Sequence, residues 1–218
     1  IDAEENIITP DKFIPVLESS SMITKLDRYI WEEAAKQLSK WKKMGREDLH
    51  ISVNISIKDF YYEDLYQVFT DLVTKYEINP GNLNLEITET VFAADTRSVN
   101  ELLQKLRDYG FHIELDDFGS GYSSLGLLKE ISVDSLKIDM SFLRRSVNTS
   151  DTEIEKSWLI LNEIARLAQA LKMETIVEGV EEKDQVDKLT EFGCKTFQGF
   201  YFAKPGSVRT FEERINLY

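Results

Sequence analysis

The sequence predicts an α/β barrel, and three observations carry that prediction. Short runs with the two-residue period of a β-strand alternate with helical patterns along most of the chain. Within the runs, apolar residues alternate with polar ones, and acidic, amide and ammonium side chains gather where the runs end. Strands joined by helices run parallel, and helices would bury both faces of an open parallel sheet. A closed barrel instead leaves polar side chains at the mouth formed by the strand ends.

Helical patterns open the chain. Pro10 stands at the first position of a short amphipathic stretch, with Thr9 as its expected N-cap. A longer helix is expected over Ile23–Lys43, because apolar residues recur along one of its faces. The remaining helical patterns are Phe60–Tyr76, Thr96–Tyr109, Ser123–Glu130, Ile154–Leu171 and Lys183–Phe192.

Six strands are expected between these helices. In the first, Val53 lies on the opposite face from Ser52 and Asn54, and the later runs alternate in the same way. The expected strands are His50–Ser56, Asn82–Thr88, Phe111–Asp116, Ser135–Asp139, Thr175–Val180 and Thr196–Phe202.

A barrel of this class has eight strands, so two more are required. Ile7 and Ile8 are interpreted as the remnant of one, and the other is expected upstream of Ile1. Only four prolines occur, and no low-complexity linker interrupts the chain. We therefore expect residues 1–218 to form one domain that is truncated at its N-terminus and belongs to a longer multidomain protein.

Composition narrows the classes of function. The chain has 26 Lys and Arg against 39 Asp and Glu, a formal net charge of −13, and no basic tract of the kind that binds duplex nucleic acid. Its one cysteine, Cys194, excludes an intrachain disulfide and suits the cytosol. No apolar run approaches the length of a membrane span. A cytoplasmic domain is expected, which could belong to a membrane-anchored protein.

The side chains at the strand ends are the candidates for chemistry, because barrel active sites lie there. Asp116 and Asp117 would point to opposite faces of a regular strand, but the glycines at 119 and 121 allow both to turn toward one site. Such oxygen ligands suit Mg²⁺ or Mn²⁺, and two ions about 3.5–4 Å apart cleave phosphoesters. The alternative is an Asp-rich turn that caps a helix.

Lys137 and Glu178 allow several interpretations. Lys137 could form a Schiff base, orient a phosphate or water, or balance the charge of Asp139. Nearby carboxylates argue against the Schiff base, because they raise the pKa of a lysine. Glu178 precedes Gly179 near a strand end and could be a metal ligand, a general base or a structural acid.

Seven segments resemble the EAL domain family in order and spacing, and together they cover essentially the whole chain. They are Phe13–Pro15, Ser52–Ser56, Leu85–Thr90, Asp116–Leu125, Leu136–Phe142, Glu178–Glu181 and Gln198–Pro205. The resemblance implies a (β/α)8 barrel with one antiparallel strand. It also implies hydrolysis of cyclic di-GMP to linear pGpG with two Mg²⁺ or Mn²⁺ ions, in a homodimer whose polypeptide carries a sensor or cyclase domain. The alternative is a non-catalytic receptor that binds cyclic di-GMP.

The resemblance also implies roles for individual residues. The implied metal ligands are Asn54, Glu86, Asp116 and Asp117. Lys137 is similar to a lysine that orients the attacking water, and Glu178 to a general base or second-site ligand. The implied substrate contacts are Gln198, Asp139 and Pro205. Glu89 is similar to a residue that anchors the loop from Phe118 to Leu125.

One departure from the family pattern concerns the signature itself. The Glu-Ala-Leu string is absent, and by motif spacing it is expected a few residues before Ile1, in the missing strand. The Asp116–Asp117 pair, Lys137 and Glu178 are all present. Degenerate members of the family that only bind the nucleotide typically lose one of these groups, so the enzyme is favoured over the receptor.

Overall fold

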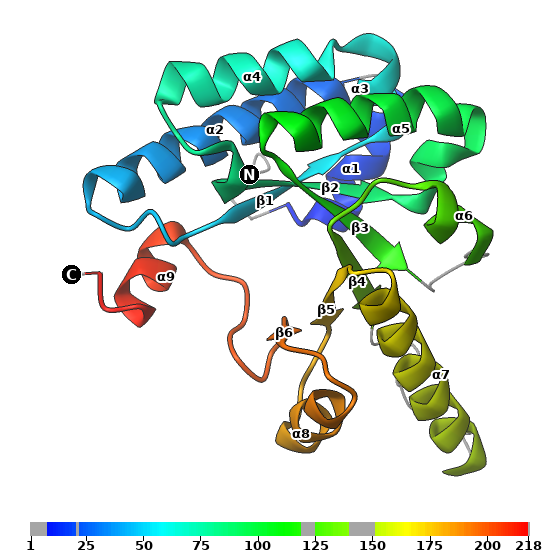
Figure 1. Ribbon diagram of the computed structural model, residues 1–218. Helices are drawn as coiled ribbons and strands as arrows, with labels where there is room; N and C mark the ends of the chain where they lie inside the picture. Colours follow the sequence, from blue (N-terminus) through cyan, green and yellow to red (C-terminus); the bar gives the residue numbers. More distant parts are fainter. Residues whose placement is uncertain (1–7, 21, 119–124, 140–150, 218) are drawn as a thin grey trace. The chain divides into compact units, whose positions relative to one another are not determined.

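The computed structural model describes residues 8–20, 22–118, 125–139 and 151–217 (Figure 1). These residues form two compact units, and each is treated by itself below. The first unit holds the described residues up to Asp116 and residues 125–135. The second holds Asp117, Phe118 and the described residues from Leu136 onward. Whether residues 1–218 fold as one domain stays a prediction.

The first unit begins with helices and continues with alternating strands and helices. Its helices are α1 (Pro10–Ser19), α2 (Ile23–Lys43), α3 (Ile57–Tyr62), α4 (Leu65–Tyr76), α5 (Phe92–Tyr109) and α6 (Leu125–Glu130). Two 3-10 turns, η1 (Pro80–Asn82) and η2 (Glu89–Val91), flank a strand. Its strands are β1 (Ile51–Ile55), β2 (Leu83–Thr88) and β3 (His112–Phe118), the last of which ends in the second unit.

Helix α2 has the bounds that the sequence predicts. It buries a stripe of residues at helical spacing that includes Trp31, Ala35 and Leu38. Trp31 is fully buried, and its ring lies 4.8 Å from that of Phe69 on α4. Lysines occupy the last turn of α2, where the helix dipole favours positive charge.

The expected helix Phe60–Tyr76 is wrong, because the chain forms two helices there. Helix α3 ends at Tyr62, and Glu63 adopts an extended conformation. The Asp64 side chain then accepts a hydrogen bond from the backbone N–H of Gln67 at 3.1 Å and starts α4. An aspartate at this position caps a helix better than it continues one, because its short side chain competes for the backbone donors.

The three strands of the first unit pair in parallel and in sequence order. Val53 is the register partner of Leu85, which in turn partners Ile113. All three are buried, so the apolar faces of the strands share one core. On β1 the predicted alternation holds, because Ser52 and Asn54 are exposed, Val53 and Ile55 are buried and Ile51 is half-buried.

The second unit continues the alternation of strands and helices. Its elements are β4 (Ser135–Asp139, of which Ser135 belongs to the first unit), α7 (Asp151–Ala170), β5 (Glu174–Glu178), α8 (Lys183–Glu191), β6 (Thr196–Phe197) and α9 (Val208–Arg214). Strands β5 and β6 pair in parallel, with Val177 opposite Phe197. The sequence did not predict α9, which begins after Ser207, whose hydroxyl accepts a hydrogen bond from the Thr210 N–H at 3.2 Å.

The expected strand Thr196–Phe202 is too long, because β6 ends at Phe197. The chain turns at Gly199, and the N–H of Tyr201 donates to the carbonyl oxygen of Val180 at 3.0 Å. The aromatic residues that follow therefore lie in a turn, where three of them stay exposed: Phe200, Tyr201 and Phe202.

The α/β class is confirmed, because six strands alternate with helices along the described ranges and every register given above is parallel. Barrel closure and the antiparallel strand stay predictions. Ile7 lies outside the described residues, and Ile8 belongs to no strand. Over the ranges that the structure describes, no helix is both long and apolar enough to span a bilayer.

Candidate active site

In the first unit, two predicted metal ligands lie side by side. Asn54 on β1 and Glu86 on β2 are register partners near the carboxyl ends of their parallel strands. Asn54 is exposed, whereas Glu86 is only 9% exposed. The indole Nε1–H of Trp31 donates to the carbonyl oxygen of Asn54 at 2.9 Å. Helix α2 therefore fixes the backbone from which the Asn54 side chain projects.

Asp116 and a buried polar pair extend this face onto β3. Asp116 is half-buried and is the register partner of Thr88, at the end of β2. Deeper along the strands, the Asn84 amide donates to Glu114 at 2.8 Å, and Glu114 is 2% exposed. The polar face of β2 and β3 thus runs from the hydrogen bond between half-buried Asn84 and buried Glu114 to Asp116 at the strand end.

Asp117 has the backbone conformation that the paired aspartates require. Its φ is +55°, in the left-handed region that is rare for residues other than glycine, although aspartate is enriched there. Asp117 itself therefore makes the turn. The sequence predicted that the glycines at 119 and 121 would allow this turn, but both lie outside the described residues.

The second unit brings three further predicted residues together. The Lys137 ammonium lies 2.9 Å from Oε1 of Glu178, and the Lys137 residue is only 4% exposed. A carboxylate oxygen of Glu178 lies within 4.8 Å of one of Asp117. The ion pair with Glu178 favours the charged ammonium, which disfavours the Schiff-base interpretation of Lys137.

Gln198 is held beside Glu178 by backbone contacts. Its N–H donates to the carbonyl oxygen of Val177 at 2.8 Å, and its own carbonyl accepts from the Val180 N–H at 3.1 Å. Gly199 makes this close approach possible, since a Cβ there would lie 2.1 Å from the Val180 carbonyl oxygen. The Gln198 backbone is therefore bonded to the residues on either side of Glu178 and Gly179.

The structure describes three other predicted residues, but it does not show the contacts that they are expected to make. Asp139 is half-buried at the end of β4, and Pro205 is exposed between β6 and α9. Glu89 starts η2, but most of the loop that it is expected to anchor, residues 119–124, lies outside the described residues. The roles of these three residues stay predictions.

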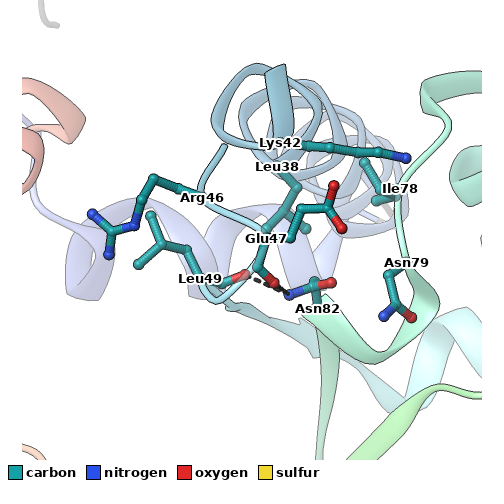
Figure 2. Close-up of a pocket in the computed structure, with 8 residues that line it drawn as sticks. All are labelled: Leu38, Lys42, Arg46, Glu47, Leu49, Ile78, Asn79 and Asn82. Carbon is teal, nitrogen blue, oxygen red and sulfur yellow. Dashed lines mark hydrogen bonds between the residues drawn. The ribbon is translucent and has the colours of Figure 1, made fainter. Parts of the chain in front are cut away.

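A small pocket in the first unit is structural. It lies beside the chain that enters β1 and β2, and its lining includes Lys42 and Arg46 (Figure 2). Within it, the Asn82 side chain donates to the carbonyl oxygens of Glu47 and Leu49, each at 2.8 Å. These bonds tie the segment before β1 to the start of β2. The candidate residues for chemistry all lie elsewhere.

The donors of the second unit suit a cation. Carboxylates as close as those of Asp117 and Glu178 repel each other unless positive charge lies nearby. Lys137 supplies one positive charge, and the oxygen donors that remain are the type that Mg²⁺ and Mn²⁺ prefer. The same donor chemistry occurs in the first unit, where Asn54 stands beside Glu86.

Comparison with known proteins decides the family. The EAL domain model matches residues 1–205. The chain belongs to the EAL domain family. The predicted resemblance is therefore confirmed.

Two curated relatives come from Pseudomonas aeruginosa. The chain is 32% identical over 202 residues to the bifunctional diguanylate cyclase/cyclic di-GMP phosphodiesterase MucR, covering 93% of this chain and 29% of MucR. It is 30% identical to the cyclic di-GMP phosphodiesterase NbdA, covering 98% of this chain and 27% of NbdA. This EAL chain therefore spans less than a third of the length of these two relatives.

Solved structures of EAL proteins match the fold. The PaMucR phosphodiesterase in complex with c-di-GMP aligns with a TM-score of 0.87 at 30% identity, covering 96% of this chain and 83% of that one. The EAL enzyme Bd1971, in a form bound to cAMP and cyclic di-GMP, aligns with a TM-score of 0.89 at 30% identity, covering 98% and 57%.

Two features that position the site were missed at the level of sequence. One is the bond from Trp31 to the Asn54 carbonyl, for which a helical apolar stripe offers no signal. The other is the contact of Gly199 with Val180. A glycine inside a strand pattern marks a close backbone approach or a bulge, so the position of Gly199 in the expected strand was an available signal.

Proposed function

We propose that this EAL domain is a metal-dependent phosphodiesterase that hydrolyses cyclic di-GMP to linear pGpG. The observation that carries the proposal is the arrangement of the second unit, where Lys137, Glu178 and Asp117 are grouped on strand ends. Relatives that are named cyclic di-GMP phosphodiesterases, and a neighbouring structure that holds c-di-GMP, support the choice of substrate.

The proposed metal ligands are Asn54, Glu86, Asp116 and Asp117, with Glu178 as a further ligand or the general base. When bound, two Mg²⁺ or Mn²⁺ ions would neutralise negative charge on the phosphate and lower the pKa of water. Asp117 would serve the second ion or both, and its left-handed backbone bends the chain at the end of its strand. The short distance to Glu178 suits the same role.

The proposed reaction consumes one water molecule. The water oxygen forms a bond to one phosphorus, and the bond from that phosphorus to the ribose 3′ oxygen breaks. One proton of the water is taken up by a base, and a proton is delivered to the departing 3′ oxygen. The product is a linear dinucleotide with a 5′ phosphate and a free 3′ hydroxyl group.

Lys137 and Glu178 have different proposed roles toward the attacking water. The Lys137 ammonium is held in a buried position by Glu178, so it can donate to the water or to a phosphate oxygen from a fixed direction. Glu178, whose Oε1 pairs with Lys137, is the proposed group that takes up a proton or binds a metal. Gln198, Asp139 and Pro205 are the proposed contacts to the nucleotide.

The setting of the domain follows from the same proposal. We place it in the cytoplasm of a bacterial cell, as a homodimer in a polypeptide with a sensor or cyclase domain. MucR, whose name includes both a cyclase and a phosphodiesterase, supports this arrangement.

Incubation of the purified protein with cyclic di-GMP tests the function. Chromatography should detect pGpG with Mg²⁺ or Mn²⁺ and none after chelation, because the carboxylates alone cannot neutralise the phosphate. Nucleotide that binds but stays intact at saturating metal would overturn the enzyme and leave the receptor. If neither binding nor turnover occurs, cyclic di-GMP is not the ligand.

A further inference from the structure

Two carboxyl groups face each other where α2 packs against α3 in the first unit. Asp59 of α3 is fully buried. Its Oδ2 accepts hydrogen bonds from the backbone N–H of Ser56 at 2.8 Å and from the Ser56 hydroxyl at 2.7 Å. Asp27 of α2 is half-buried, and its carboxyl group lies within hydrogen-bond reach of the Asp59 side chain.

The second oxygen of Asp59 lacks a donor. Its Oδ1 is buried, and no N–H or O–H group of the described residues is seen to donate a hydrogen bond to it. A buried carboxylate oxygen left in this way costs about 1–3 kcal/mol or more. Two ionised carboxylates in contact would add repulsion, whereas a proton on Asp27 would turn the repulsion into an O–H···O⁻ hydrogen bond.

The electrostatics of Asp27 agree with this geometry. Burial, and next the negative charge of Asp59, raise the pKa of Asp27 from 3.8 to about 7. The hydrogen bonds act in both directions, since the bond to Asp59 raises this pKa and a bond to Ser56 lowers it. Asp27 therefore holds its proton far above the pH at which an exposed aspartic acid loses it.

We propose that Asp27 and Asp59 form a buried proton-binding site, in which the proton resides on Asp27 and is donated to Oδ1 of Asp59. The site joins α2 to the first turn of α3, where Asp59 forms the capping box with Ser56. Loss of the proton leaves two carboxylates in contact and loosens this junction. The proton site thus makes the stability of the first unit depend on pH near neutrality.

Within the residues that the structure describes, no positive side chain is among the main influences on Asp27. The charges that act on it are those of Asp59 and, more weakly, Glu18 of α1, both negative. Among the other elements packed against α2, β1 has no titratable side chain, and β2 brings Glu86.

Three positive side chains on α2 and the helices packed against it have partners elsewhere. Lys75 of α4 pairs with Glu32 at 2.8 Å, and Arg28 of α2 pairs with Glu63 after α3 at 3.3 Å. Lys58 of α3 donates to the backbone carbonyl of Glu18.

The direction of the pH dependence follows from the raised pKa. Between 3.8 and about 7 the folded protein holds a proton on Asp27 that the unfolded chain has released. The stabilising contribution is therefore complete below pH 3.8, falls as the pH rises, and is lost above about 7. This direction is opposite to that of a carboxylate held by an ion pair.

Asp27→Asn and Asp59→Asn test the site by thermal unfolding at pH 5.5 and 8.5. Either amide can donate to the remaining carboxylate without a proton. The wild-type midpoint should fall by roughly 3–6 °C more than that of either variant over this range. At pH 8.5 both variants should unfold at a higher temperature than the wild type. Equal pH slopes in all three proteins would overturn the proposal.

Two further measurements distinguish a proton bound by this pair from other causes of a pH-dependent stability. Infrared spectra of the wild type should lose a protonated-carboxyl band between pH 6 and 8.5, and Asp27→Asn should not show this loss. Glu18→Gln should still show the protonated-carboxyl band at low pH, and the pH at which half of the band is lost should be slightly lower than in the wild type. If Mg²⁺ at pH 8.5 raises the unfolding midpoint more in the wild type than in Asp27→Asn, the pair binds a metal ion and the proton site is wrong.

Discussion

In the first unit, Asn54 and Glu86 stand on strands whose other face is packed with buried apolar side chains, whereas in the second unit Lys137, Glu178 and Gln198 are held by polar contacts. Strands β1, β2 and β3 contribute an apolar layer of nearly inaccessible residues: Val53, Ile55, Leu83, Leu85, Ile87, Ile113 and Leu115. The strands of the second unit also bury apolar residues, such as Leu136, Ile138 and Val177, but its candidate residues are held in addition by an ion pair, two backbone hydrogen bonds and one glycine contact.

The difference separates stability from geometry. Apolar burial has no direction, so it stabilises a strand without fixing the angle of one side chain. Ion pairs and hydrogen bonds have direction, and a change at one of them moves the groups that it holds. We therefore expect substitutions around the candidate residues of the first unit to lower mainly stability, and those of the second unit to lower turnover as well.

Glu178→Gln should have the largest effect on turnover. The amide keeps the size of the side chain but can neither take up a proton nor bring charge to a metal, so kcat should fall by about 10²–10⁴-fold. Binding of cyclic di-GMP should be largely retained. Glu174→Gln is the matched control, since Glu174 lies exposed at the other end of β5. Near-normal kcat in Glu178→Gln would make Glu178 a structural acid.

Lys137→Met should show that the ion pair of the second unit balances charge. Without the ammonium, the Glu178 carboxylate loses its positive partner beside Asp117, and the free energy of unfolding should fall by at least about 2 kcal/mol without metal. Saturating Mn²⁺ should restore much of this loss, while kcat stays about 10²-fold low. Denaturant unfolding with and without Mn²⁺ measures both effects. A stability loss that Mn²⁺ leaves unchanged would contradict this account.

Gly199→Ala should damage the second unit through the backbone. The added Cβ would meet the Val180 carbonyl at 2.1 Å, so the Gln198 turn must move away from the residues that flank Glu178. The expected cost is about 1–3 kcal/mol of stability, with a clear fall in kcat. At Gly206 an added Cβ meets only the Thr210 side chain, at 3.4 Å, so Gly206→Ala should change neither. Equal behaviour of the two variants would show that the contact with Val180 is not needed.

Trp31→Phe provides the counterpart in the first unit. It removes the donor to the Asn54 carbonyl and part of a buried ring, which should cost about 1–2 kcal/mol of stability. Because the apolar layer still supports β1, kcat should change only a few-fold. A loss of kcat as large as that of Glu178→Gln would show that the first unit also depends on one directional contact.

The sequence predicted the elements better than it predicted the contacts between them. Helix α2 and strand β4 have their predicted bounds, since periodicity records which face of an element is buried. The break before α4 and the early end of β6 were missed, because Asp64 and Gly199 act through local backbone geometry that overrides a periodic pattern. The Asp27–Asp59 contact was missed because it joins two helices that lie far apart in the sequence.

The candidate site shows the same limit. Strand-end polarity and the family resemblance selected Asn54, Glu86, Lys137 and Glu178, and the structure places the first two in register and the last two in an ion pair. The left-handed conformation of Asp117 was not predicted, because no residue pattern specifies the φ angle of an aspartate.

Calorimetric titration with Mn²⁺ tests the central claim that Asp117 and Glu178 bind the same cation. The wild type and Glu174→Gln should bind Mn²⁺ with the same affinity. Asp117→Asn and Glu178→Gln should each bind at least about 10-fold more weakly, because each loses a charged oxygen donor at the site. If all four proteins bind Mn²⁺ equally, the carboxylates of the second unit hold no metal, and the proposed mechanism is wrong.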